Sequence, residues 1–80
     1  MTDRLQTLDR LQPGESAVIE RLETRGSMRR RFCDIGLIEH TLVECLGTSP
    51  GGGISAYLVR GAVIAIRAKD ARGVSVDILR

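Results

Sequence analysis

Aromatic residues are scarce in this sequence of 80 residues, which contains one Tyr, one Phe and no Trp. Because apolar residues nevertheless make up 42% of the chain, we expect a core built mainly from aliphatic side chains. A chain of this length forms one small domain, which buries only about 60% of the surface that its unfolded form exposes. The sequence therefore predicts a single domain over residues 1–80, of modest stability.

Long apolar runs are missing as well. The longest wholly apolar run is Ala62–Ile66, whereas a helix that spans a bilayer needs about 20 apolar residues. The first six residues are polar and do not resemble a secretory leader. We therefore expect a cytoplasmic protein that does not insert directly into a membrane and is not itself a channel or carrier. Any role in transport would be exerted on another chain.

Cysteine is too rare for a disulfide framework, since only Cys33 and Cys45 are present. Two unpaired thiols fit a reducing, cytosolic environment. With His40, these two residues are the candidate metal ligands, but they lack the paired spacing of a zinc site. We expect Cys45 to be buried as a small apolar residue, Cys33 to be partly buried, and His40 to lie in a loop. No cofactor is predicted; a surface contact of His40 with Fe²⁺ or another divalent metal stays open.

No catalytic motif is present either. His40 has no Ser or Cys partner at motif spacing, and no carboxylate pair stands apart from the other surface charges. The run Gly51–Gly53 is not followed by Gly-Lys-Ser/Thr or by a predicted helix, so it favours a flexible connection between strands over a phosphate loop. The sequence predicts a protein that is not an enzyme.

Positive charge is concentrated in Arg25 and Arg29–Arg31, although the net charge is only +2. Such a run is typical of a solvated helix face, or it forms a docking surface for an acidic partner, with Arg29 and Arg30 as candidates. A nucleic-acid-binding domain usually has a larger basic excess, and binding of single strands usually adds exposed aromatic side chains. We therefore predict no nucleic-acid partner; an RNA-binding small barrel is a third possibility, which salt-dependent binding would reveal.

The segment Gly53–Arg67 carries the clearest structural signal. Its two apolar runs, Ala56–Val59 and Ala62–Ile66, are rich in residues that favour strands, and they flank the dipeptide Arg60-Gly61. Because Gly adopts the positive φ that tight hairpin turns need, this pattern predicts a β-hairpin that turns at Arg60-Gly61.

Elsewhere the pattern predicts strands at 16–22, 41–46 and 74–78, and one helical turn at 69–73. A helix should begin after Ser27 as its N-cap and end at Gly36. Its apolar face would contain Met28, Phe32 and Ile35. The fold class is then mainly β, a small SH3-like barrel of about five strands with one short helix after the first strand. An OB-fold is the competing architecture.

Residues alternate along the strand predicted at 41–46. If Val43 and Cys45 face the core, Leu42 and Leu46 point outward, near Ile54 or Tyr57. They form either a small cluster under the loop at 47–53 or an exposed apolar patch for a partner or a second copy. Leu42, Leu46 and Tyr57 therefore join the partner-binding candidates, and a homo-oligomer is possible.

The order of motifs from Leu8 to Val76 is similar to that of the FeoA family, small cytosolic proteins of bacterial ferrous iron uptake. It resembles, more distantly, the SH3-like domain at the end of iron-dependent repressors of the diphtheria toxin repressor type. The matching residues are Leu8, Leu11, Gly14, Ile19, Arg31-Phe32, Ile35-Gly36-Leu37, Val43, Cys45, Ser49-Pro50, the glycines of the following loop, Ala56 to Gly61, Ile64 to Arg67, Asp70-Ala71, Val74 and Val76.

The resemblance implies a non-catalytic accessory protein that acts by protein–protein interaction on FeoB, the membrane transporter of ferrous iron. The alternative is a metal-responsive regulatory domain that works with a transcription factor. Because the chain shows no helix-turn-helix pattern, the alternative would need a separate DNA-binding partner. Tight binding of iron or manganese by the isolated domain would favour this alternative.

Overall fold

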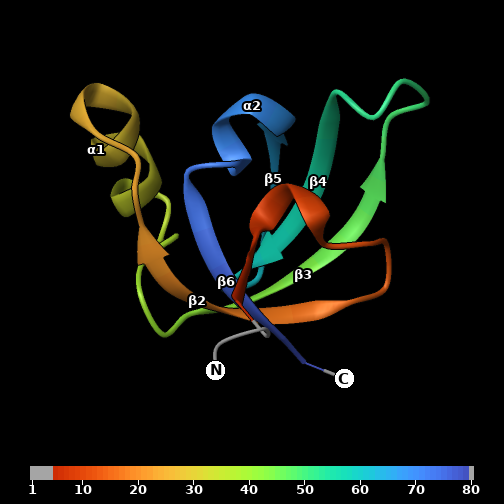
Figure 1. Cartoon of the computed structure of the whole chain (residues 1–80), viewed down its shortest axis with the longest axis horizontal. Coiled ribbons are helices and arrows are strands. Elements are labelled where there is room, and N and C mark those ends of the chain that lie inside the picture. Colours follow the sequence, from red (N-terminus) through yellow and green to blue (C-terminus); the bar gives the residue numbers. More distant parts are fainter. Residues whose placement is uncertain (1–4, 80) are drawn as a thin grey trace.

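The structure, a computed structural model, describes residues 5–79 and is mainly β (Figure 1). Its elements in chain order are β1 (Leu5–Thr7), the 3-10 helix η1 (Leu8–Arg10), β2 (Ser16–Leu22), α1 (Gly26–Asp34), β3 (Leu42–Thr48), β4 (Ile54–Val59), β5 (Ala62–Arg67), α2 (Ala68–Ala71) and β6 (Val74–Leu79). The predicted strand at 16–22 is confirmed, and those at 41–46 and 74–78 are confirmed with small shifts of their ends.

The six strands form one antiparallel sheet in the order β1-β6-β2-β3-β4-β5. The last strand, β6, lies between β1 and β2, so the two ends of the described chain pair side by side at one edge of the sheet. The strands curve around a shared interior (Figure 1). Within residues 5–79, no pairing joins the two outermost strands, β1 and β5, so the expected closure of the barrel through hydrogen bonds is not found.

The prediction of five strands missed β1. This strand has only three residues, and it pairs with β6 at the far end of the chain, with Leu5 opposite Asp77. Because no local pattern marks so short a segment, its strand character comes from this distant pairing alone. The helix α1 consequently follows the second strand and not the first.

The hairpin of β4 and β5 is confirmed in detail. Val59 pairs with Ala62, which leaves Arg60 and Gly61 as a two-residue turn. Their φ values are 53° and 83°, so both residues are left-handed, as a type I′ turn requires. This turn matches the right-handed twist of the flanking strands and fixes which face of β5 points inward.

The helix α1 ends as predicted but begins differently. At its end, the N–H of Leu37 donates to the carbonyl of Phe32 at 2.8 Å, and Gly36 has a φ of 90°. With the bond from the Gly36 N–H to the Cys33 carbonyl, this is a Schellman motif. The N-cap is Arg25, without a side-chain bond to the helix, so the prediction of Ser27 as N-cap was wrong. The helix begins two residues earlier than predicted, at Gly26.

The core is aliphatic, as expected, and takes in both aromatic side chains. Its buried side chains are Leu8, Leu11, Ala17, Ile19, Leu22, Phe32, Leu37, Val43, Cys45, Tyr57, Val59, Ile66, Ala71, Val74, Val76 and Ile78. Every strand from β2 to β6 contributes to this core, at alternate positions in β3, β4 and β6, whereas β5 contributes one fully buried residue, Ile66. The opposite face of the sheet and the exposed side of α1 remain as the surfaces on which a partner can bind.

Candidate functional site

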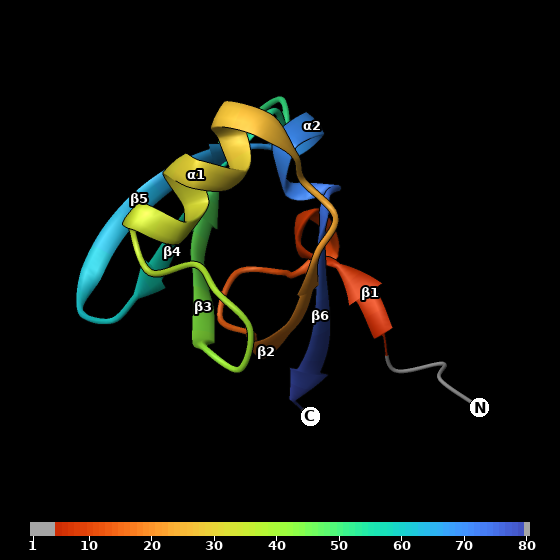
Figure 2. The ribbon, with the colours of Figure 1, turned by 90° about the vertical axis from the view of Figure 1, so that its left-hand side faces the viewer.

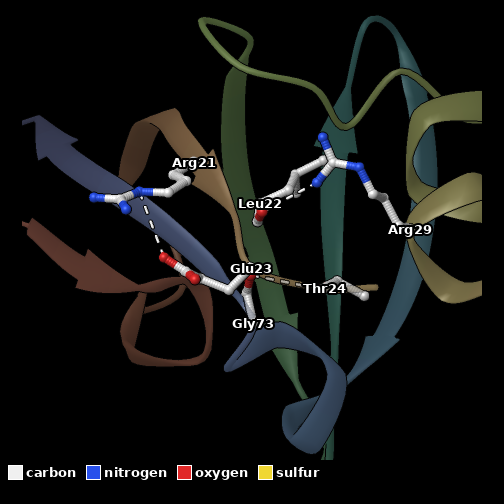
Figure 3. A network of polar contacts seen from close by, with 6 residues as sticks. All are labelled: Arg21, Leu22, Glu23, Thr24, Arg29 and Gly73. Carbon is white, nitrogen blue, oxygen red and sulfur yellow. Dashed lines mark hydrogen bonds and ion pairs between the residues drawn. The ribbon is translucent and has the colours of Figure 1, made fainter. Parts of the chain in front are cut away.

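The first candidate surface is the cationic helix α1, on which Arg29, Arg30 and Arg31 are all exposed. Arg29 has a structural contact, since its guanidinium Nη1 donates to the carbonyl of Leu22 at 3.1 Å (Figure 3). This bond ties α1 to the end of β2. The sequence thus correctly predicted a positive helix face, and the structure gives Arg29 an additional role in holding the helix in place.

The segment that leads into α1 is also tied to the turn before β6 (Figure 3). The backbone N–H of Glu23 donates to the carbonyl of Gly73 at 2.6 Å, and the hydroxyl of Thr24 donates to the same oxygen at 3.4 Å. Arg21 and Glu23 form an exposed ion pair at 3.4 Å, which contributes little to stability. These contacts fix where α1 begins relative to the sheet.

A groove of about 300 Å³ lies between α1 and β5. Apolar side chains from both elements line it, namely Met28, Phe32, Ile35, Ile64 and Ile66, together with Ala65 and the charged Arg31, Arg67 and Asp70. Arg67 and Asp70 form an ion pair at 3.7 Å. The groove is therefore mainly apolar, and its charged residues are Arg31, Arg67 and Asp70. The sequence did not predict it, because neither Ile64 nor Arg67 is near α1 along the chain.

The second candidate surface is the outer face of β3, β4 and β5. Leu42 and Val63 are 56% and 64% exposed, and Val63 lies opposite the half-buried Leu58. Leu46 is 44% exposed, so the loop at 47–53 does not cover it. The predicted directions of Leu42 and Leu46 are confirmed, and the option of a covered cluster is wrong. A second groove, of about 420 Å³, is lined on this face by residues that include His40, Leu42, Glu44, Leu58 and Arg60.

Tyr57 does not belong to either surface. Its side chain is 1% exposed, and its hydroxyl donates to the carbonyl of Leu8 at 3.3 Å. Tyr57 pairs with Cys45 across β3 and β4 and points into the core with it. The expectation that Tyr57 offers a surface to a partner was therefore wrong: the strand phase that buries Cys45 and Val59 also buries Tyr57. Burial raises the pKa of its hydroxyl above the ordinary value of 10.0.

Replacing Tyr57 with Phe should lower the free energy of unfolding by about 1 kcal/mol at neutral pH, because the carbonyl of Leu8 loses its donor. The variant should also change the alkaline pH dependence. The folded state keeps the hydroxyl protonated above the pH at which the unfolded chain ionises, so the wild type loses stability as the pH rises from about 10 through the raised pKa. Thermal melts of both proteins across this range test it. Parallel losses in the two proteins would contradict the assignment.

The three candidate metal ligands are not brought together. Cys45 is fully buried, Cys33 is exposed on α1 rather than partly buried, and His40 is exposed in the turn before β3 with a φ of 72°. The backbone N–H of His40 donates to the carbonyl of Ile19 at 2.7 Å. Among residues 5–79, no group of three or more His, Cys, Asp or Glu side chains is placed to hold a metal ion. In the same part of the chain, no helix has the length and apolar character to cross a membrane.

Comparison with protein families shows a match between residues 6–78 and the FeoA domain. The comparison with curated proteins finds no match. Solved structures, in contrast, give several.

The FeoA protein of Chlorobium tepidum is 27% identical with a TM-score of 0.88, over 94% of this chain and 71% of that one. A FeoA from Stenotrophomonas maltophilia, solved with zinc and identified as an SH3-domain protein, is 26% identical with a TM-score of 0.80, over 94% and 96%. A manganese-dependent transcriptional repressor is 19% identical with a TM-score of 0.87, over 98% and 43%, which shows a shared fold alone. The fold of this chain is SH3-like, as predicted, and the competing OB-fold is wrong.

Proposed function

This chain belongs to the FeoA domain family, a family of non-catalytic accessory proteins associated with ferrous iron transport, and from this premise we propose that it binds a FeoB-type transporter of ferrous iron. The observation that carries the proposal is the family match, which spans residues 6–78 of the 80-residue chain. We further propose that it works in the cytoplasm as one domain, on the cytosolic part of the transporter.

The described surface supports an interaction module. Exposed Leu42 and Leu46 lie on the face of β3 opposite the buried core, so they are available to a partner without unfolding the domain. Arg30 and Arg31 on α1 supply positive charge, which raises the association rate with an acidic surface and orients the partner. A regulatory contact combines the two: buried apolar side chains contribute to affinity, and complementary charge orients the partner.

The experiment is a pull-down of the transporter's cytosolic part with the purified chain, combined with measurement of ferrous iron uptake in cells that lack the protein. Binding with a loss of uptake on deletion is the expected result. Absence of binding together with unchanged uptake would contradict the proposal. Calorimetric titration with Fe²⁺ and Mn²⁺ separates it from the regulatory alternative, which requires tight binding of metal by the chain itself.

Reversing one charge on the helix should slow the approach of the transporter. For Arg30→Glu, we expect the association rate constant to fall by about threefold to tenfold at low salt, with a smaller effect at high salt. Surface plasmon resonance measures it. Arg21→Glu on β2 is the control, because Arg21 is also exposed but its side chain points away from α1 (Figure 3). Equal effects of the two variants would show that only net charge matters.

A further inference from the structure

The outer edge of β5 is an open hydrogen-bonding edge. β5 is the last strand in the sheet order, and in Figure 2 it forms the margin of the ribbon beside α1. A two-residue turn is closed by a hydrogen-bonded pair, here Val59 and Ala62, and such pairs alternate along an antiparallel ladder. Ala62, Ile64 and Ile66 therefore bond to β4. The N–H and C=O groups of Val63 and Ala65 point away from the sheet, toward solvent.

The two edges of this sheet differ in how they are protected. β1, at one edge, has three residues, and very short edge strands resist pairing with other chains. β5 has six residues, Ala-Val-Ile-Ala-Ile-Arg, with no Pro, no Lys and no acidic residue. Its only charge is Arg67 at the end. A strand of this composition is a ready template for an added strand unless a partner covers it.

Apolar surface lies on both faces of this edge. On the outer face, Val63 is 64% exposed and continues the surface of Leu58. On the inner face, Ile64 and Ile66 line the groove shared with α1. Because successive side chains of a strand point to opposite faces, a segment added beside β5 would place alternate residues over Val63 and into the groove.

We propose that β5 binds an extended, acidic and apolar segment of a protein partner, which adds to the sheet as a further strand. Main-chain bonds to Val63 and Ala65 supply the alignment, and the groove takes the partner's apolar side chains. The charge of α1 favours acidic residues in the segment, since the helix has three Arg and a single acidic residue, Asp34. If the segment belongs to the transporter, the inference rests on the function proposed above.

A second copy of this chain is a less favourable occupant. Two β5 strands paired about a twofold axis would bring their α1 helices to the same side of the joined sheet. Each helix carries Arg29–Arg31, so like charges would face one another across the axis. An acidic segment meets the same surface with opposite charge.

The test removes one outward N–H group of β5, that of Val63, and leaves the other residues of the strand unchanged. Val63→Pro eliminates the donor at the open edge, whereas Val63→Ala keeps it and shortens the side chain. Leu79→Ala, on β6, is the matched control, because Leu79 is 49% exposed and lies away from this edge. Circular dichroism and melting confirm that each variant is folded. The probes are the transporter's cytosolic part and two synthetic peptides, one with Val alternating with Glu and one with Val alternating with Lys.

We expect Val63→Pro to weaken binding of the transporter part and of the Val–Glu peptide at least about tenfold, with Val63→Ala and Leu79→Ala each losing less than about threefold. The Val–Lys peptide should bind at least about tenfold more weakly than the Val–Glu peptide. If Val63→Pro does not fold, Ala65→Pro removes the next outward donor and gives the same comparison.

The possible failures can be told apart. If the transporter part binds Val63→Pro as tightly as wild type, the added-strand mode is wrong and the proposed function stands. If only the Val–Glu peptide binds, with the expected order of variants, the mode stands and the proposed partner is wrong. If neither probe binds, or if sedimentation shows a dimer that Val63→Pro dissociates, the acidic segment is not the occupant and the inference is overturned.

Discussion

Replacing Ile19 with Ala is expected to lower the free energy of unfolding by about 2–5 kcal/mol. Ile19 lies at the centre of β2, between β6 and β3, and its side chain is fully buried. The change removes packed methylene groups and leaves a cavity that the surrounding strands cannot fill, because both neighbours are fixed by ladder hydrogen bonds. A domain of this size has a total stability of roughly 4–12 kcal/mol, so the loss is a large share of it.

Thermal melting should show this as a fall in the midpoint of at least about 10 °C. Ile54→Ala is the matched control, since it deletes the same atoms from a side chain that is 46% exposed at the start of β4. We expect its effect to stay within about 0.5 kcal/mol. Similar midpoints for the two variants would mean that Ile19 does not face the interior, and that the inward face of β2 is misassigned.

The second large effect is expected at the hairpin turn. Gly61→Val should lower the free energy of unfolding by about 1–3 kcal/mol, because a β-branched residue is strained at a φ of 83°. An added Cβ at Gly61 would meet no atom within 4 Å, so the cost is one of backbone conformation and not of a clash. Chemical denaturation measures it.

Two further variants make this test specific. Gly51→Val places the same side chain in equally open space at a glycine whose φ is not positive, and we expect little change. Gly61→Asn should cost less than Gly61→Val, because Asn tolerates left-handed backbone better than other non-glycine residues. If Gly61→Val and Gly51→Val unfold at the same denaturant concentration, Gly61 does not adopt the positive φ on which the expected strain depends.

The elements that could be predicted from the sequence are those whose signal is local. The β4–β5 hairpin has its turn residues and both apolar runs within one segment, and β6 alternates from Val74 to Ile78. β1 could not be predicted, because Leu5–Thr7 is a strand only through pairing with β6. The order of strands could not be predicted either, because it depends on β6 inserting between β1 and β2.

In the candidate site, too, the features that could be predicted are those with a local signal in the sequence. The outward direction of Leu42 and Leu46 follows from period-two alternation within β3 and was predicted. The burial of Tyr57 follows from its pairing with Cys45, which a reading of β4 alone does not reveal. The groove between α1 and β5 and the open edge of β5 depend on tertiary arrangement, so no stretch of sequence contains their signal.

The position of β6 between β1 and β2 has a consequence for folding kinetics. β6 pairs with β2 over nearly its whole length, with Ala17 opposite Ile78, so closing the sheet joins segments about sixty residues apart. The loop entropy of this closure must be lost before any contact between the two strands compensates for it. Refolding on the scale of milliseconds to seconds is therefore expected for this small chain. Until β6 docks, β2 has its own unpaired edge, so the half-folded molecule is the form most prone to aggregate.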